Sequence, residues 1–281
     1  MRESSNPVFR SLPKGQQGGY AQFGTGAAGY GAQAVHADPY VTQYPDQQQT
    51  GVSRPMTIDD VVTKTGVTLA VLTAVAVVSY FIATVNPGLA MMLAMVGAIG
   101  GLVLVLVATF GRKQDNPAIV LSYAGLEGLF LGAITFLFAN VISNGGYSMI
   151  AQAVVGTLGV FFGMLVVYKT GAIRVTPKFT RMIVAGMFGV LALMLVNFLA
   201  AIIGGGDGLG LRSGGMLAIG FSLLCIGLAA FSFLIDFDAA DQMIRAGAPE
   251  KAAWGVALGL TVTLVWLYVE ILRLLSYFNQ D

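Results

Sequence analysis

The chain has 281 residues, of which 56% are hydrophobic and only 10% are charged. Charged residues make up roughly a quarter of soluble domains, so the composition excludes an ordinary soluble protein and indicates an integral membrane protein. The net charge of +1 offers no basic face, and we expect no nucleic-acid partner. The only histidine, His36, precedes the apolar part, which excludes histidine-dependent metal sites and catalytic triads there. We therefore expect no enzyme and no stably bound cofactor.

Residues 1–55 are rich in Gly, Gln, Tyr and Ala, as in the run GQQGGYAQFGTGAAGYGAQA, and contain few aliphatic residues. Such a segment cannot bury a core, so we predict a disordered tail followed by one membrane domain over residues 56–281. Because the polar tail precedes the first apolar segment, we expect no cleaved signal peptide.

Seven apolar segments follow, and each has about the 20 residues that a helix needs to cross the hydrocarbon layer. Thr57 is suited to cap the first helix, with Asp59 and Asp60 in its first turn. We predict an all-α integral membrane protein with seven transmembrane helices. The predicted spans are 61–85, 88–110, 117–141, 148–168, 180–203, 213–235 and 252–276.

Small residues one helical turn apart recur in four of these spans. Such pairs let helix backbones approach closely, and we interpret them as packing within the bundle rather than as dimer contacts. The pairs are Gly97 with Gly101, Gly128 with Gly132, Gly159 with Gly163, and Gly255 with Gly259.

The distribution of Lys and Arg predicts the orientation in the membrane. With the tail placed inside, only Arg212 and Arg273 of the 15 basic residues lie near the outer side. The positive-inside rule therefore places the N-terminus in the cytoplasm and the C-terminus outside, and we predict a bacterial plasma membrane as the location.

Acidic residues within the apolar segments are the main functional signal, because ionised groups in hydrocarbon are costly and often mark ion or proton routes. Glu127 lies about 15 Å beyond the start of its helix. If the sixth helix continues to Gly247, Asp236 and Asp238 lie about 14 to 17 Å from that turn, at a similar level. Glu270, on the last helix, lies about 10 Å beyond the level of these aspartates toward the outer side, so we treat it as a separate site.

Spacing separates the three aspartates of the sixth helix. Asp236 and Asp238 are two residues apart and point in different directions, so we expect only one of them to face the bundle centre. Asp241 and Arg245 are one turn apart and are suited to a surface ion pair. In an alternative reading the helix ends at Ile235, which leaves the aspartates in a wet loop.

Two alternatives also stay open for the glutamates. Glu127 can make a structural hydrogen bond to a neighbouring helix, and Glu270 can pair with Arg273 one turn later. The functional reading is that close carboxylates share a proton, because both cannot easily ionise. When deprotonated, a pair such as Asp238 and Glu127 is a hard oxygen site for transient Ca²⁺ binding. Competition between Ca²⁺ and H⁺ then predicts a pH-sensitive path.

Two other classes of membrane protein are disfavoured. A retinal protein needs a lysine midway along the last helix, but Lys251 lies at its start. The stretch Gly204–Asp207 fits the Gly-x-Gly-Asp pattern of intramembrane aspartyl proteases, yet it lies in a Gly-rich loop, and no Tyr-Asp partner precedes it.

The run Leu234-Ile235-Asp236-Phe237-Asp238, the following turn and the last helix (GLTVTLVWLYVEILRLLS) resemble the last two helices of the Bax inhibitor-1 family. This family is also called the transmembrane Bax inhibitor motif family. Residues 125–135 resemble its third helix, and the likeness to a bacterial member covers about residues 57–278. The resemblance implies six helices around the C-terminal one. It also implies a pH-sensitive calcium leak gated by two aspartates, one on each of the last two helices.

Within this resemblance, Asp238 matches the aspartate of the sixth helix, whereas Thr263 stands where the seventh-helix aspartate is expected. Glu127 or Glu270 then supplies the second carboxylate, or the chain has lost the leak. Family members also restrain cell death in eukaryotes, and some bacterial ones act on a membrane-bound ATP-dependent protease. The second hypothesis is therefore a non-conducting regulator that binds a membrane protein such as a protease.

Overall fold

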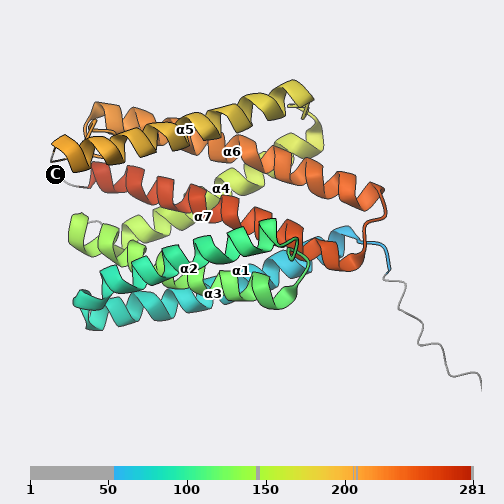
Figure 1. Cartoon of the computed structure of the whole chain (residues 1–281), viewed down its shortest axis with the longest axis horizontal. Helices are drawn as coiled ribbons and strands as arrows, with labels where there is room; N and C mark the ends of the chain where they lie inside the picture. The colour runs from blue at the N-terminus through green and yellow to red at the C-terminus, as the bar shows by residue number, and fades with distance from the viewer. Residues whose placement is uncertain (1–53, 144–145, 205, 207, 280–281) are drawn as a thin grey trace, which may run out of the picture. The chain divides into compact units, whose positions relative to one another are not determined.

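The computed structural model describes residues 54–143, 146–204, 206 and 208–279 (Figure 1). These residues include seven helices that are long and apolar enough to cross a membrane, so the protein is an all-α, multi-pass membrane protein. The helices are α1 (Ile58–Val85), α2 (Ala90–Phe110), α3 (Pro117–Phe136), α4 (Gly146–Thr170), α5 (Pro177–Gly204), α6 (Met216–Arg245) and α7 (Ala253–Phe278). Short helical turns at Pro87–Leu89 and Glu250–Ala252 precede α2 and α7, and a π-helical stretch, Leu137–Ile142, extends α3.

Two sequence-based predictions concern residues that lie outside the described part of the chain. One is the disordered tail, of which residues 1–53, with the histidine, are not described, and the other concerns the aspartate at position 207. Arg54 and Pro55 are described, although the predicted tail included them. Pro55 forms an antiparallel bridge with Pro249 in the α6–α7 turn.

The predicted cap of α1 is confirmed. The Thr57 hydroxyl accepts a hydrogen bond from the Asp60 amide, and the Asp60 carboxylate accepts one from the Thr57 amide at 2.9 Å. This reciprocal pair satisfies two amide groups that the first helical turn leaves without partners. The Asn116 side chain caps α3 in a similar way, accepting from the Ala118 amide at 2.9 Å.

Helix α6 continues through its aspartates to Arg245, as the depth argument for these residues assumed, so the alternative in which the helix ends at Ile235 is wrong. The chain then reverses at Gly247, which has a φ of 67°, a left-handed conformation that glycine adopts without steric cost. Asp236, Asp238 and Asp241 therefore project from a regular helix.

Helix α7 forms the centre of the bundle, with about two-thirds of its most apolar window buried. Four helices, α1, α3, α4 and α6, pack directly against it, while α2 packs chiefly on α3 and α5 on α6 (Figure 1). The resemblance implied six helices around the last one. Four of the six form an inner layer around α7, and α2 and α5 form an outer layer. Helix α5 is the most peripheral, since none of its most apolar window is buried.

Glycines bring α3 close to both of its neighbours. A methyl group added at Gly132 would clash with the Ala76 carbonyl oxygen of α1, and one added at Gly97 of α2 would clash with the Phe130 amide of α3. These close approaches confirm the packing interpretation for α2 and α3. In α4, no such neighbour lies within 4 Å of the position that a Cβ would take at Gly159 or Gly163.

Candidate functional site

Asp236 is the aspartate of α6 that meets α7. The Thr263 hydroxyl donates a hydrogen bond to Asp236 Oδ2 at 2.7 Å. This bond joins α6 to α7 at the position where the family resemblance implies the second aspartate. The Thr263 hydroxyl also lies 3.2 Å from the Gly259 carbonyl oxygen of its own helix.

Asp236 also lines a cavity of about 380 Å³, which we call the turn-side cavity because the α6–α7 turn lies at this end of the bundle. Arg112 and Asp115, from the connection between α2 and α3, line it together with Asp236. Gly255 and Gly259 of α7 form part of the wall. The cavity thus joins a charged loop region to a carboxylate within the bundle.

The other two aspartates of α6 have different surroundings. Asp238 accepts a hydrogen bond from Gln242 Nε2 at 2.6 Å on its own helix. Asp241 makes the expected ion pair with Arg245 at 2.7 Å and accepts a hydrogen bond from the Tyr168 hydroxyl of α4 at 3.3 Å. The motif match pointed to Asp238, but the residue that pairs with the Thr263 position is Asp236.

A second cavity, of about 640 Å³, lies between α3, α5 and α7, and we call it the lateral cavity. It contains the two predicted glutamates, Glu127 of α3 and Glu270 of α7. A methyl group added at Gly101 of α2 would clash with the Glu127 carboxylate, so this side chain packs against bare helix backbone. Within the described residues, Glu127 has no hydrogen-bond or ion-pair partner, and the structural hydrogen bond considered for it is not present.

Glu270 is held by two arginines at the other end of the lateral cavity. Its Oε1 atom accepts from Arg273 Nη1 at 2.6 Å, which is the ion pair offered as an alternative by the sequence. The same atom accepts from Arg212 Nη1 and Nη2 at 3.3 Å each. Arg212, from the connection between α5 and α6, is a residue that sequence reasoning missed, since its partner lies 58 positions away.

The structure does not join Glu127 to an aspartate of α6. Asp236 lines the turn-side cavity, Glu127 lines the lateral cavity, and Asp238 lines neither. Asp238 and Glu127, which the sequence suggested as a calcium site, therefore share neither of these cavities. Among the described residues, no group of three or more acidic, histidine or cysteine side chains is placed to hold a metal ion.

The two cavities follow one face of α7. Gly255 and Gly259 line the turn-side cavity, while Val262, Trp266 and Glu270 line the lateral cavity. These positions are three or four residues apart, a spacing that puts them on a single helix face. The cavities therefore succeed each other along α7 from the turn toward its C-terminal end.

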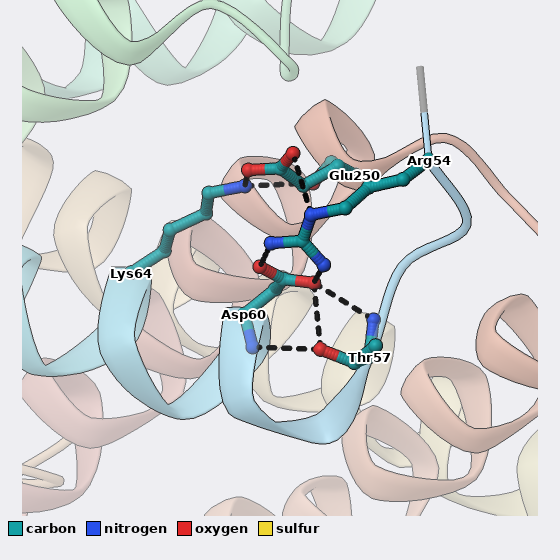
Figure 2. A network of polar contacts seen from close by, with 5 residues as sticks. All are labelled: Arg54, Thr57, Asp60, Lys64 and Glu250. Carbon is teal, nitrogen blue, oxygen red and sulfur yellow. Dashed lines mark hydrogen bonds and ion pairs between the residues drawn. The ribbon is translucent and has the colours of Figure 1, made fainter. Parts of the chain in front are cut away.

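A second feature that sequence reasoning missed is an ionic network at the start of α1 (Figure 2). Arg54 makes two hydrogen bonds with the Asp60 carboxylate, at 2.6 and 2.9 Å, and its Nε lies 3.3 Å from Glu250. Lys64 Nζ bonds to the Glu250 carbonyl oxygen at 2.8 Å and lies 3.3 Å from its carboxylate. The bond to Asp60 raises the pKa of Arg54 above its ordinary value.

Backbone hydrogen bonds complete this connection, which we call the N-terminal strap (residues 54–57). The Met56 amide donates to the Ala248 carbonyl at 2.8 Å, and the Glu250 amide donates to the Arg54 carbonyl at 3.0 Å. The Met56 side chain is fully buried in the main core cluster, beside α6 and α7. The strap thus ties the start of α1 to the α6–α7 turn.

Comparison with known families gives one extensive match. The family described as Bax inhibitor 1 like matches residues 6–280, nearly the whole chain. The comparison with individual curated proteins found no match to this chain.

Proposed function

The chain belongs to the Bax inhibitor-1-like family, and from this premise we propose that it is a pH-sensitive cation leak in which Asp236 controls the passage of Ca²⁺. The observation that supports the proposal most directly is the bond between Asp236 and Thr263. It places a carboxylate of α6 against the central helix, at the wall of a cavity that starts among the charged side chains of the α2–α3 connection.

The succession of cavities along α7 suggests the route. A cation that enters the turn-side cavity reaches Asp236 first, and the lateral cavity then offers Glu127 and Glu270 further along the same helix face. Carboxylate, hydroxyl and carbonyl oxygens are the ligands that Ca²⁺ prefers. The distribution of basic residues predicts that the turn end faces the cytoplasm, so Asp236 would be reached from that side.

The dependence on pH follows from competition at Asp236. A carboxylate binds a cation only when it is deprotonated, so a proton and a cation exclude each other at this position. Lowering the pH should therefore reduce the flux, and raising it from 6 to 8 should increase it. The Thr263 hydroxyl supplies a second oxygen beside the carboxylate.

The test is Ca²⁺ entry into proteoliposomes that contain a fluorescent calcium indicator, measured from pH 6 to 8. We expect Asp236→Asn to abolish the pH-dependent flux, because the amide carries no negative charge. Asp238→Asn is the matched control, since Asp238 lies two residues away on the same helix and lines neither cavity. Equal flux in the wild type and Asp236→Asn, or equal loss in both variants, would contradict the proposal.

A non-conducting regulator is the second candidate, and the exposure of α5 favours it. This helix packs chiefly on α6 and leaves its most apolar window uncovered, so a helix of another membrane protein has room to pack there. Under this reading the wild type shows no carboxylate-dependent flux, and Asp236→Asn still co-purifies with a membrane partner such as an ATP-dependent protease.

A further inference from the structure

The end of the lateral cavity that holds Arg212 and Arg273 has an excess of positive charge. The Glu270 carboxylate lies between the two guanidiniums, and it is the one acidic group among the described residues that pairs with either. Glu127 lines the same cavity, but helical rise places it about 10 Å nearer the turn end. Two arginines and one glutamate leave a net charge of +1 at this level.

The two guanidiniums also have unused hydrogen-bonding capacity. Three hydrogen bonds join them to an oxygen atom, and all three end on Glu270 Oε1. Arg212 has additional contacts at 3.2 and 3.3 Å only with the Met194 sulfur, which is a weak acceptor. Most of their N–H donors therefore lack an oxygen acceptor within the described residues. An oxyanion with several acceptor oxygens complements both the charge and the donors.

Both arginines are largely enclosed rather than free in water. The side chains of Arg212 and Arg273 are 22% and 18% exposed, and their guanidiniums lie 5.5 Å from the Phe221 ring and 5.7 Å from the Phe138 ring. Arginine held against aromatic rings is preorganised for bidentate recognition of phosphate. Solvated surface arginines would lack this restriction.

The depth of the pair matches that of lipid phosphates. Arg273 lies five residues before the end of α7 at Phe278, or about 8 Å along the helix axis. The headgroup region on each side of a bilayer is about 5 to 8 Å thick, and long basic side chains extend toward it. The guanidiniums therefore lie near the level at which phospholipid phosphates are found.

The rest of the lateral cavity suits an acyl chain. Its walls are mostly apolar, with Phe188 and Leu191 of α5 facing Val262 and Trp266 of α7. These α5 side chains are exposed in the isolated chain, so the cavity opens between helices toward the surrounding lipid. The charged end and the apolar walls together match an amphipathic ligand.

We propose that the lateral cavity is a binding site for an anionic phospholipid, whose phosphate contacts Arg212 and Arg273 and whose acyl chain lies between α5 and α7. The ligand is a lipid rather than a free anion, because the cavity walls next to the arginines are apolar and open toward the bilayer. The lipid site shares the lateral cavity with the proposed cation route, whereas Asp236, which controls that route, lines the turn-side cavity. Lipid binding is measured without any ion flux, so its test does not depend on the proposed function.

The experiment measures lipid binding to the purified full-length protein: phosphatidylglycerol is titrated in, and native mass spectrometry detects the protein–lipid complex. Two further ligands separate the contributions of the phosphate and the acyl chains. Diacylglycerol with the same acyl chains lacks the phosphate, and inorganic phosphate lacks the acyl chains. We expect retention of phosphatidylglycerol, at least tenfold weaker binding of diacylglycerol, and no displacement by millimolar inorganic phosphate. Equal binding of diacylglycerol, or displacement by inorganic phosphate, would overturn the lipid site without any variant having to fold.

Variants then assign the residues. Arg212→Gln and Arg273→Gln should each weaken phosphatidylglycerol binding about tenfold, because each removes one charged contact with the phosphate. Arg245→Gln is the control, since Arg245 is 78% exposed and pairs with Asp241 at the turn end. Unchanged binding in both cavity variants, or an equal loss in the control, would refute the assignment.

Discussion

The bond between Thr263 and Asp236 makes a measurable prediction about stability. Thr263→Val replaces the hydroxyl by a methyl group of similar size and leaves Asp236 Oδ2 without its partner on α7. Interhelical hydrogen bonds in membrane proteins contribute about 0.6 kcal/mol on average and reach about 1.7 kcal/mol. Because this acceptor is a carboxylate at 2.7 Å, we expect a loss near the upper end, about 1.5 kcal/mol.

Thr261→Val is the matched control on the same helix. Thr261 is fully buried, and its hydroxyl bonds at 2.7 Å to the Ala257 carbonyl oxygen of its own helix, so no other helix loses a partner. We expect a loss below about 1 kcal/mol, the usual net contribution of a neutral hydrogen bond. The free energy of unfolding is measured in mixed micelles at increasing fractions of a denaturing detergent. Trp254 and Trp266, both on α7, supply the fluorescence signal.

A double-mutant cycle makes the test specific. In an Asp236→Ala background, Thr263→Val should cost about 1 kcal/mol less than in the wild type, because the interhelical bond is already absent. Equal losses of unfolding free energy for Thr261→Val and Thr263→Val, or additive losses in the cycle, would show that the hydrogen bond between Thr263 and Asp236 does not contribute to stability. The structural basis of the proposed function would then be lost.

Three further predictions concern packing and charge. Gly132→Ala should destabilise the protein by about 1 to 3 kcal/mol through overpacking against α1, whereas Gly125→Ala, with open space, should be neutral or stabilising in the same detergent unfolding assay. Glu270→Gln should cost on the order of 3 kcal/mol, because two enclosed guanidiniums lose their charged partner; an unchanged unfolding midpoint would contradict the ion-pair geometry. Asp60→Asn should lower the melting temperature more than the exposed control Asp59→Asn, and high salt should reduce the difference.

Local rules predicted the helices and the contacts within them. The seven spans followed from length and hydropathy, and the pairs Asp241–Arg245 and Glu270–Arg273 followed from spacings of four and three residues. Each depends on one segment of chain, so no knowledge of the bundle was needed.

Contacts between helices could not be predicted in the same way. Their distances from the α6–α7 turn placed Asp236 and Asp238 at a similar depth, but depth does not determine which aspartate faces α7. That choice depends on how α6 is rotated in the bundle, and the structure selects Asp236. The same argument placed Glu127 at a similar depth, yet Glu127 packs against Gly101 of α2 and lines the lateral cavity with residues of α5 and α7, not with the aspartates of α6.

The N-terminal strap has a consequence for the order in which the protein is assembled. Arg54 and Lys64 reach Glu250 across nearly the whole membrane domain, with 186 residues separating Lys64 from its partner. Since ribosomes deliver the N-terminal part first, α1 must enter the membrane while its ionic partner has not yet been synthesised. Closure of the strap therefore requires that translation has passed Glu250, and a nascent chain truncated before residue 248 would keep this junction open.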